Sequence, residues 1–133
     1  MTQEEKELLI KDLCARLDTN LVCSIHRTDD EGVGYRDEIL HGYCKGDIWY
    51  EFYFREDCSV GIDNVSKIKP YLFPLSSMTD KQKDEYQYIT ERWMYDSSYS
   101  ISDSTDWLNK NHFYYRGLIK KGLAIDATGL NIY

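Results

Sequence analysis

Two cysteine–histidine pairs give the chain its clearest chemical pattern. Cys23 precedes His26 by three positions, and His41 precedes Cys44 by three. Two thiolates and two imidazoles form a ligand set that zinc takes in tetrahedral sites. Both pairs fall in stretches with a strand pattern, however, and positions three apart on a strand point to opposite faces of a sheet. We therefore favour two partly buried cysteines and two sheet histidines, with convergence of the four on a metal as the open alternative.

A cysteine nucleophile is a second kind of site that these residues suggest. It needs an exposed thiol of low pKa beside an imidazole. Cys23 and His41 would face each other across the first predicted hairpin, and Cys58, in a polar turn, is expected to be the most exposed thiol. The flanking residues match no cysteine-enzyme signature. Free thiols in a reducing compartment are therefore the expectation.

Acidic residues on predicted strands offer a third kind of chemistry. A hydrolase usually pairs two carboxylates across a cleft, and Asp37, Glu38 and Glu51 are the candidates. We favour the simpler interpretation, in which strand charges deter edge-to-edge aggregation. The glycines are scattered and match neither the dinucleotide-binding nor the Walker pattern. The sequence therefore predicts no cofactor and no catalytic residue.

The segment from His112 to Gly117 combines one arginine with several aromatic residues. Arg116 beside such rings can hold an anion or a carboxylate of a partner. We favour a structural role, in which Phe113 and Tyr115 pack between two short helices and Arg116 bonds carbonyls at a helix end.

Composition narrows the classes of partner. The net charge of −7 argues against binding to a nucleic-acid backbone and to an anionic membrane surface, both of which need basic residues. The N-terminus lacks the apolar stretch of a signal peptide, and no apolar run approaches the length of a membrane span. We therefore expect a cytoplasmic protein. Aromatic residues reach 14%, and 12 of them are tyrosine, a residue suited to recognition faces.

The elements that would position these residues indicate a single α+β domain over residues 1–133. Thr2 and Glu5 form the pattern of a capping box, and leucines at helical spacing follow. Strands are then predicted at 21–26, 35–43, 48–54 and 59–62, as an antiparallel meander. If the turn near residue 46 is tight, Trp49 lies across from Gly42. Ile39, His41 and Tyr43 then share a face with Ile48, Tyr50 and Phe52.

The second half of the chain is predicted to be mainly helical. The segment 69–75 contains both prolines and is expected to be extended, as an edge strand. Thr79 and Gln82 predict the cap of a second helix. A loop over 95–103, a third helix near 105–111 and a short helix over 115–121 follow, and the tail from 123 adds a strand or docks on the surface. The predicted fold is thus an N-terminal helix, an antiparallel sheet of four to five strands, and C-terminal helices packed on one face.

Three groups of residues resemble a family of short uncharacterised proteins from gut anaerobic bacteria and their mobile elements. They are MTQEEKELL at 1–9 with DLCARL at 12–17, KPYL at 69–72 with PLSSMT at 74–79, and WLNK at 107–110 with HF at 112–113, YRGLI at 115–119 and KGLA at 121–124. The resemblance covers about half of the chain. It implies a compact intracellular protein encoded on a mobile element, and it carries no established activity. Phe73 replaces a usual basic residue and Tyr114 a usual acidic one.

Small size, acidic charge, abundant tyrosine and the lack of a catalytic motif favour a non-enzymatic protein-interaction or regulatory module. The expected partner is a protein, which includes a second copy of this chain in a homodimer. A membrane or a nucleic acid is not expected as the partner. Binding of single-stranded nucleic acid through aromatic stacking is disfavoured by the acidic charge. The alternative function is a small hydrolase or transferase with an unrecognised carboxylate or Cys–His site. The candidate contact residues are Trp49, Tyr53, Tyr95, Tyr99 and Arg116.

Overall fold

A computed structural model describes the chain except for residues 30–31, 46–49, 55–57, 93 and 97–99. Its elements, in chain order, are α1 (Gln3–Ala15), β1 (Val22–Asp29), β2 (Gly32–Lys45), β3 (Tyr50–Phe54), β4 (Ser59–Gly61), the 3-10 helix η1 (Ile62–Lys67), β5 (Ile68–Leu72), the 3-10 helix η2 (Leu75–Ser77), α2 (Asp80–Arg92), α3 (Ile101–Lys110) and β6 (Ile125–Asp126). The predicted α+β class is confirmed.

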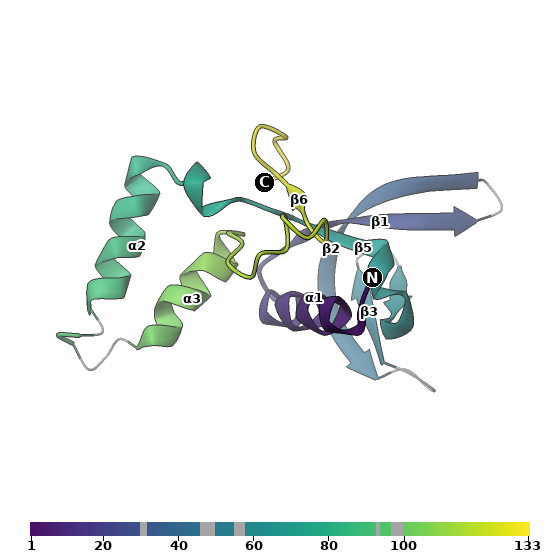
Figure 1. Ribbon diagram of the computed structural model, residues 1–133, viewed down its shortest axis with the longest axis horizontal. Helices are drawn as coiled ribbons and strands as arrows, with labels where there is room; N and C mark the ends of the chain where they lie inside the picture. Colours follow the sequence, from purple (N-terminus) through teal and green to yellow (C-terminus); the bar gives the residue numbers. More distant parts are fainter. Residues whose placement is uncertain (30–31, 46–49, 55–57, 93, 97–99) are drawn as a thin grey trace.

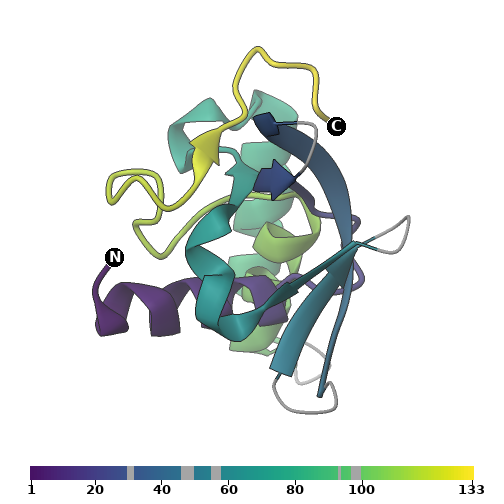
Figure 2. The same ribbon diagram turned by 90° about the vertical axis from the view of Figure 1, so that its right-hand side faces the viewer.

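The strands form one six-stranded sheet in the order β4-β3-β2-β1-β5-β6. All neighbouring pairs are antiparallel except β5 and β6, which are parallel. The first four strands form the predicted meander. The fifth then joins the far side of β1, so η1 must carry the chain from one edge of the sheet across its inner face. Figure 2 shows η1 and α1 on the same side of the curved strands.

The core lies between α1, η1 and this inner face of the sheet. Leu9 and Leu13 of α1 are fully buried, as the leucine spacing predicts. The sheet contributes Cys23, Ile25 and Phe52, each 2% exposed or less. Helix α1 begins where the sequence predicts, because the Thr2 hydroxyl accepts a hydrogen bond from the Glu5 amide and the Glu5 carboxylate accepts one from the Thr2 amide.

A bulge in β2 changes the predicted register with β3. Leu40 pairs with Phe54, but Gly42 pairs with Tyr53, so one extra residue lies between the two pairs. Tyr43 still shares a face with Phe52, as expected. His41 does not: its ring lies against Tyr53 on the opposite face, 5.5 Å between centroids. The aromatic residue over Gly42 is Tyr53, which corrects the prediction of Trp49.

The C-terminal segment contacts the sheet in two ways: it forms β6, and the side chain of Tyr133 bonds to two neighbouring strands. The Tyr133 hydroxyl donates a hydrogen bond to the Tyr71 carbonyl at 2.8 Å and accepts one from the Val22 amide at 3.1 Å. It thereby bridges β1 and β5 beyond their last paired residues, Cys23 and Pro70. The expected strand in the tail is confirmed by β6. Because β6 pairs with the end of β5, this strand is not the edge strand that was predicted for the segment 69–75.

Helices α2 and α3 pack on each other and stand at the opposite end of the molecule from the β1–β2 hairpin (Figure 1). Helix α2 begins at the predicted cap, where Thr79 and Gln82 exchange hydrogen bonds of 2.9 and 3.2 Å. None of the described side chains of α2 is buried. The core is therefore covered by α1 and η1, and α2 extends away from it.

Two predictions in this half of the chain are wrong. Helix α3 begins at Ile101 and not near 105, because Ser100 and Asp103 form a capping box. Residues 115–121 form turns and not a helix. His112 has a φ of 62° and Gly117 a φ of 72°. Both values lie outside the right-handed helical region, so the backbone changes direction at these positions and does not continue as a helix.

Candidate interaction surface

The structure separates the two cysteine–histidine pairs. Cys23 is fully buried on the inner face of β1, whereas the ring of His26 lies on the other face against Tyr35. His41 lies against Tyr53, and Cys44, in the register beside Glu51, is exposed. Among the described residues, no group of three or more His, Cys, Asp or Glu side chains could hold a metal ion.

The expected nucleophile geometry is also wrong. The cross-strand partner of Cys23 is Glu38 and not His41. Burial raises the pKa of the Cys23 thiol far above its usual value. Cys58, expected to be the most exposed thiol, is 3% exposed, and burial raises its pKa as well. A thiol held in the protonated form by burial is a poor nucleophile.

The strand carboxylates serve local interactions. Glu38 is buried and forms an ion pair with Arg36. Asp37 accepts a hydrogen bond of 2.9 Å from the hydroxyl of Tyr71, whose pKa is raised by burial and by that carboxylate. Glu51 pairs with Cys44 and Gly61 in the sheet ladder. These three carboxylates point to both faces of the sheet and do not form a pair across a cleft.

Arg116 belongs to a buried ionic cluster that joins α1 to the C-terminal segment. Asp12 and Arg16, both fully buried, form an ion pair of 2.9 Å, and Arg116 Nε lies 3.3 Å from the other Asp12 oxygen. Arg16 also donates to the Phe113 carbonyl at 2.6 Å. The Tyr115 ring packs against both guanidinium groups. The carbonyl-binding role expected of Arg116 is thus taken by Arg16, and we leave Arg116 out of the candidate surface.

The other predicted contact residues lie apart from one another. Trp49 and Tyr99 lie outside the described residues. Tyr53 is 36% exposed over Gly42, on the sheet. Tyr95 follows α2 and is 82% exposed, and the neighbouring Met94 is 64% exposed. Tyr95 is therefore the predicted contact residue that the structure associates with an open apolar surface.

A groove of about 470 Å³ lies between α2 and α3, and we call it the helix-pair groove. Its lining side chains are Asp84, Glu85, Tyr88, Ile89 and Trp107. Tyr88 is 51% exposed, although it is aromatic. Apolar side chains gathered at the surface in this way mark interaction sites in soluble proteins.

The floor of the helix-pair groove is rigidly supported. Trp107 stacks on Phe113 with 5.7 Å between centroids and 8° between planes, and Phe113 is itself 1% exposed. Tyr86 lies on Trp107 at 5.6 Å. The aromatic surface is therefore held in place from below by the protein interior, an arrangement found at energetically important contact residues.

A smaller hollow of about 300 Å³ adjoins the groove along α2. Its lining comprises Tyr88, Glu91, Arg92 and Tyr95, so Tyr88 belongs to both. The Arg92 guanidinium lies over the Tyr88 ring at 4.7 Å. Asp84 and Tyr88 are four positions apart, which places them on one face of α2, and Tyr95 lies beyond the end of that helix at Arg92. The spacing of Asp84 and Tyr88 along the sequence could have indicated this face of the helix.

Comparisons with protein-family models, with curated proteins and with solved structures find no match for this chain. The resemblance to short proteins of gut anaerobes thus stays a prediction. Among the described residues, no helix has the length and apolar character required to cross a bilayer.

Proposed function

We propose that this protein is a non-enzymatic interaction module, which binds a basic amphipathic helix of another protein in the helix-pair groove. One observation carries the proposal. Helix α2 has 13 residues, none of its described side chains is buried, and its aromatic face is open toward α3. A helix gains most of its stability by burying an apolar face. A helix that leaves such a face open is suited to bury it against a partner.

The shape of the groove favours a helical occupant. Tyr88, Ile89 and Trp107 line a hollow that runs between two packed helices. An amphipathic helix laid into such a hollow inserts side chains at positions i, i+3, i+4 and i+7. Tyrosine and tryptophan are the residues that contribute most to such contacts.

The charge of the groove favours a basic partner. Asp84 and Glu85 lie at the groove, while Glu91 and Arg92 bring one charge of each sign to the adjoining hollow. The whole chain has a net charge of −7, so approach of a basic segment is favoured at long range as well. A second copy of this chain would bring like charges together at the same surface. We therefore favour another protein over a homodimer, and regulation of that protein by covering its basic segment.

Selection from a display library of amphipathic helical peptides, whose polar faces range from acidic to basic, tests the proposal. We expect the selected peptides to be basic. Tyr88→Ser should weaken their binding by about ten-fold or more, because the aromatic ring lines the groove. Asp84→Lys combined with Glu85→Lys should weaken it further and reduce its dependence on salt.

The matched control is Tyr35→Ser, which removes another exposed tyrosine, 75% exposed on β2, far from α2. It should leave binding unchanged. All of these variants should unfold at the temperature of the parent protein, since the substituted side chains are not buried. Selection of acidic and basic peptides alike, or equal binding by Tyr88→Ser, would refute the proposal.

A further inference from the structure

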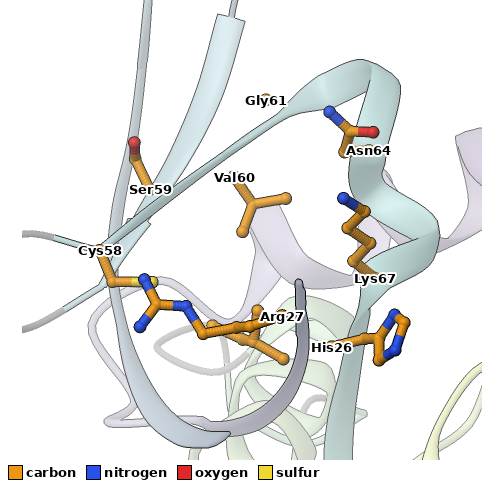
Figure 3. Close-up of a pocket in the computed structure, with 9 residues that line it drawn as sticks. His26, Arg27, Cys58, Ser59, Val60, Gly61, Asn64 and Lys67 are labelled. Carbon is orange, nitrogen blue, oxygen red and sulfur yellow. The ribbon is translucent and has the colours of Figure 1, made fainter. Parts of the chain in front are cut away.

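A second surface, on the other side of the molecule from the helix-pair groove, has the features of a small-molecule site. It is a pocket of about 300 Å³ at the place where β1, β4 and η1 meet (Figure 3). Val60, 7% exposed, and Cys58, 3% exposed, contribute its apolar floor. The volume is that of a pocket for a small organic ligand.

The pocket is cationic in an acidic protein. Arg27 from β1 and Lys67 from η1 line it, and its described lining contains no carboxylate. Among the described residues, neither of these two cations takes part in an ion pair. Arg36 and Glu38 also influence the Cys58 thiol, and they pair with each other. The described lining therefore brings two positive charges and no carboxylate to this pocket.

The two cations approach the pocket from opposite sides. Figure 3 shows the Arg27 guanidinium beside Cys58 and the Lys67 ammonium beside Asn64, with Val60 between them. Ser59 and Asn64 add a hydroxyl and an amide to the rim. Arginine holds a carboxylate through two parallel N–H donors, and lysine acts as a compact point charge. His26 also lines the pocket, where Figure 3 shows its ring beside Lys67, and the same ring packs against Tyr35 at 5.0 Å.

From this arrangement we propose that the pocket binds a small organic dicarboxylate, with one carboxylate on Arg27, the other on Lys67, and a short apolar body over Val60. The positive groups at both ends match the two charges, and the apolar floor matches the methylene chain between them. A cleft lined by one sign of charge concentrates oppositely charged solutes. The site is independent of the helix-pair groove, so each of the two proposals can fail alone.

Titration of the full chain with succinate, glutarate and adipate, followed by calorimetry and by NMR amide shifts, tests this inference. We expect saturable binding at millimolar concentration, with shifts at Ser59, Val60 and Asn64. Butyrate, which has one carboxylate, should bind at least ten-fold more weakly. Arg27→Gln and Lys67→Gln should each weaken dicarboxylate binding by about ten-fold or more, because either change leaves one carboxylate without its cation.

The control is Lys69→Gln, which removes an exposed lysine of β5 outside the pocket lining and should leave binding unchanged. The thermal unfolding of each variant without ligand reports whether it is folded. Three results would overturn the inference: no saturation by any of the three dicarboxylates, equal binding by the folded Arg27→Gln and Lys67→Gln variants, or binding of inorganic phosphate as tight as that of the best dicarboxylate, which would indicate a single anion site.

Discussion

One carboxylate shared by two guanidinium groups joins the first helix to the last third of the chain. Asp12 has no exposed surface and contacts both Arg16 and Arg116. Two guanidinium groups share this one carboxylate, so the cluster carries more positive than negative charge, and Arg16 Nη1 has no hydrogen-bond partner among the described residues. Removal of one member from a buried ion pair leaves an uncompensated charge, which costs far more than the net contribution of the intact pair.

We predict that Asp12→Ala lowers the free energy of unfolding by about 3–5 kcal/mol, because both arginines then lose their carboxylate. Urea unfolding followed by circular dichroism measures the change. The control is Glu7→Ala, which removes an exposed carboxylate from the same helix and should change stability by less than about 0.5 kcal/mol. A loss of equal size in the two variants would show that the cluster does not stabilise the fold.

His112 is predicted to make stability depend on pH. Burial lowers its pKa below the usual 6.5, while its Nε2 lies 2.7 Å from the Thr19 carbonyl and its ring stacks on Tyr133 at 3.8 Å. The unfolded chain therefore takes up this proton at a higher pH than the folded chain. The stability contributed by neutral His112 is complete above about pH 6.5 and is lost as the pH falls through the folded pKa.

The measurement is the unfolding free energy of the parent and of His112→Asn between neutral and mildly acidic pH. Asparagine tolerates the φ of 62° at this position. The parent should lose up to about 1.4 kcal/mol more per pH unit than the variant in that window. His41→Asn, at an exposed histidine, serves as the control and should keep the parent's slope. Parallel slopes for the parent and His112→Asn would contradict the assignment.

At the scale of elements, the bulge between Leu40 and Gly42 decides which side chains of β2 and β3 meet. It keeps Leu40 and Phe54 in the core and turns Tyr53 onto the bare backbone of Gly42. A Cβ at Gly42 would overlap the Tyr53 hydroxyl group, so the two residues exclude any side chain larger than hydrogen at this position unless the ring moves.

Gly42→Ala is therefore expected to displace the Tyr53 ring and to destabilise the protein by about 1 kcal/mol or more. Tyr53→Ala removes the obstacle, so Gly42→Ala should cost less in that background. A double-mutant cycle of unfolding free energies measures this coupling. Strictly additive effects of the two substitutions would mean that the close approach of ring and glycine has no energetic consequence.

Local signals in the sequence predicted most helices and strands. The features that were not predicted depend on contacts between residues far apart in the sequence. The boxes at Thr2 and Thr79 located the starts of α1 and α2, because a cap needs only residues three positions apart. The same rule applied to Ser100 would have located α3. The bulge near His41 and the pairing of β5 with β1 depend on packing across the sheet, and no spacing along the chain records them.

The candidate surface was predictable only in part. Tyr95 was identified because tyrosines gather near it in the sequence, and the structure places it just beyond the end of α2 at Arg92. The sequence does not show that the face of α2 around Tyr88 stays exposed to solvent. A pattern of apolar residues on a helix normally predicts burial in the core, and here α1 and η1 already cover that core.

At the scale of the whole molecule, the hydrophobic core lies at one end and the exposed helix-pair groove at the other. The sheet, α1 and η1 contain most of the buried side chains, while α2 and α3 extend from that body with their shared groove exposed (Figure 1). Helix α2 contributes none of its described side chains to the buried core. A partner can therefore cover the groove without any rearrangement of the fold.

The most direct test of this division is an NMR titration of the full, isotopically labelled chain with a basic amphipathic helix selected against it. We predict that the amides shifted on binding lie in α2 and α3, around Tyr88, Ile89 and Trp107, and that those of α1 and of the β1–β2 hairpin do not move. Shifts confined to the sheet or to α1, with α2 unchanged, would contradict the account.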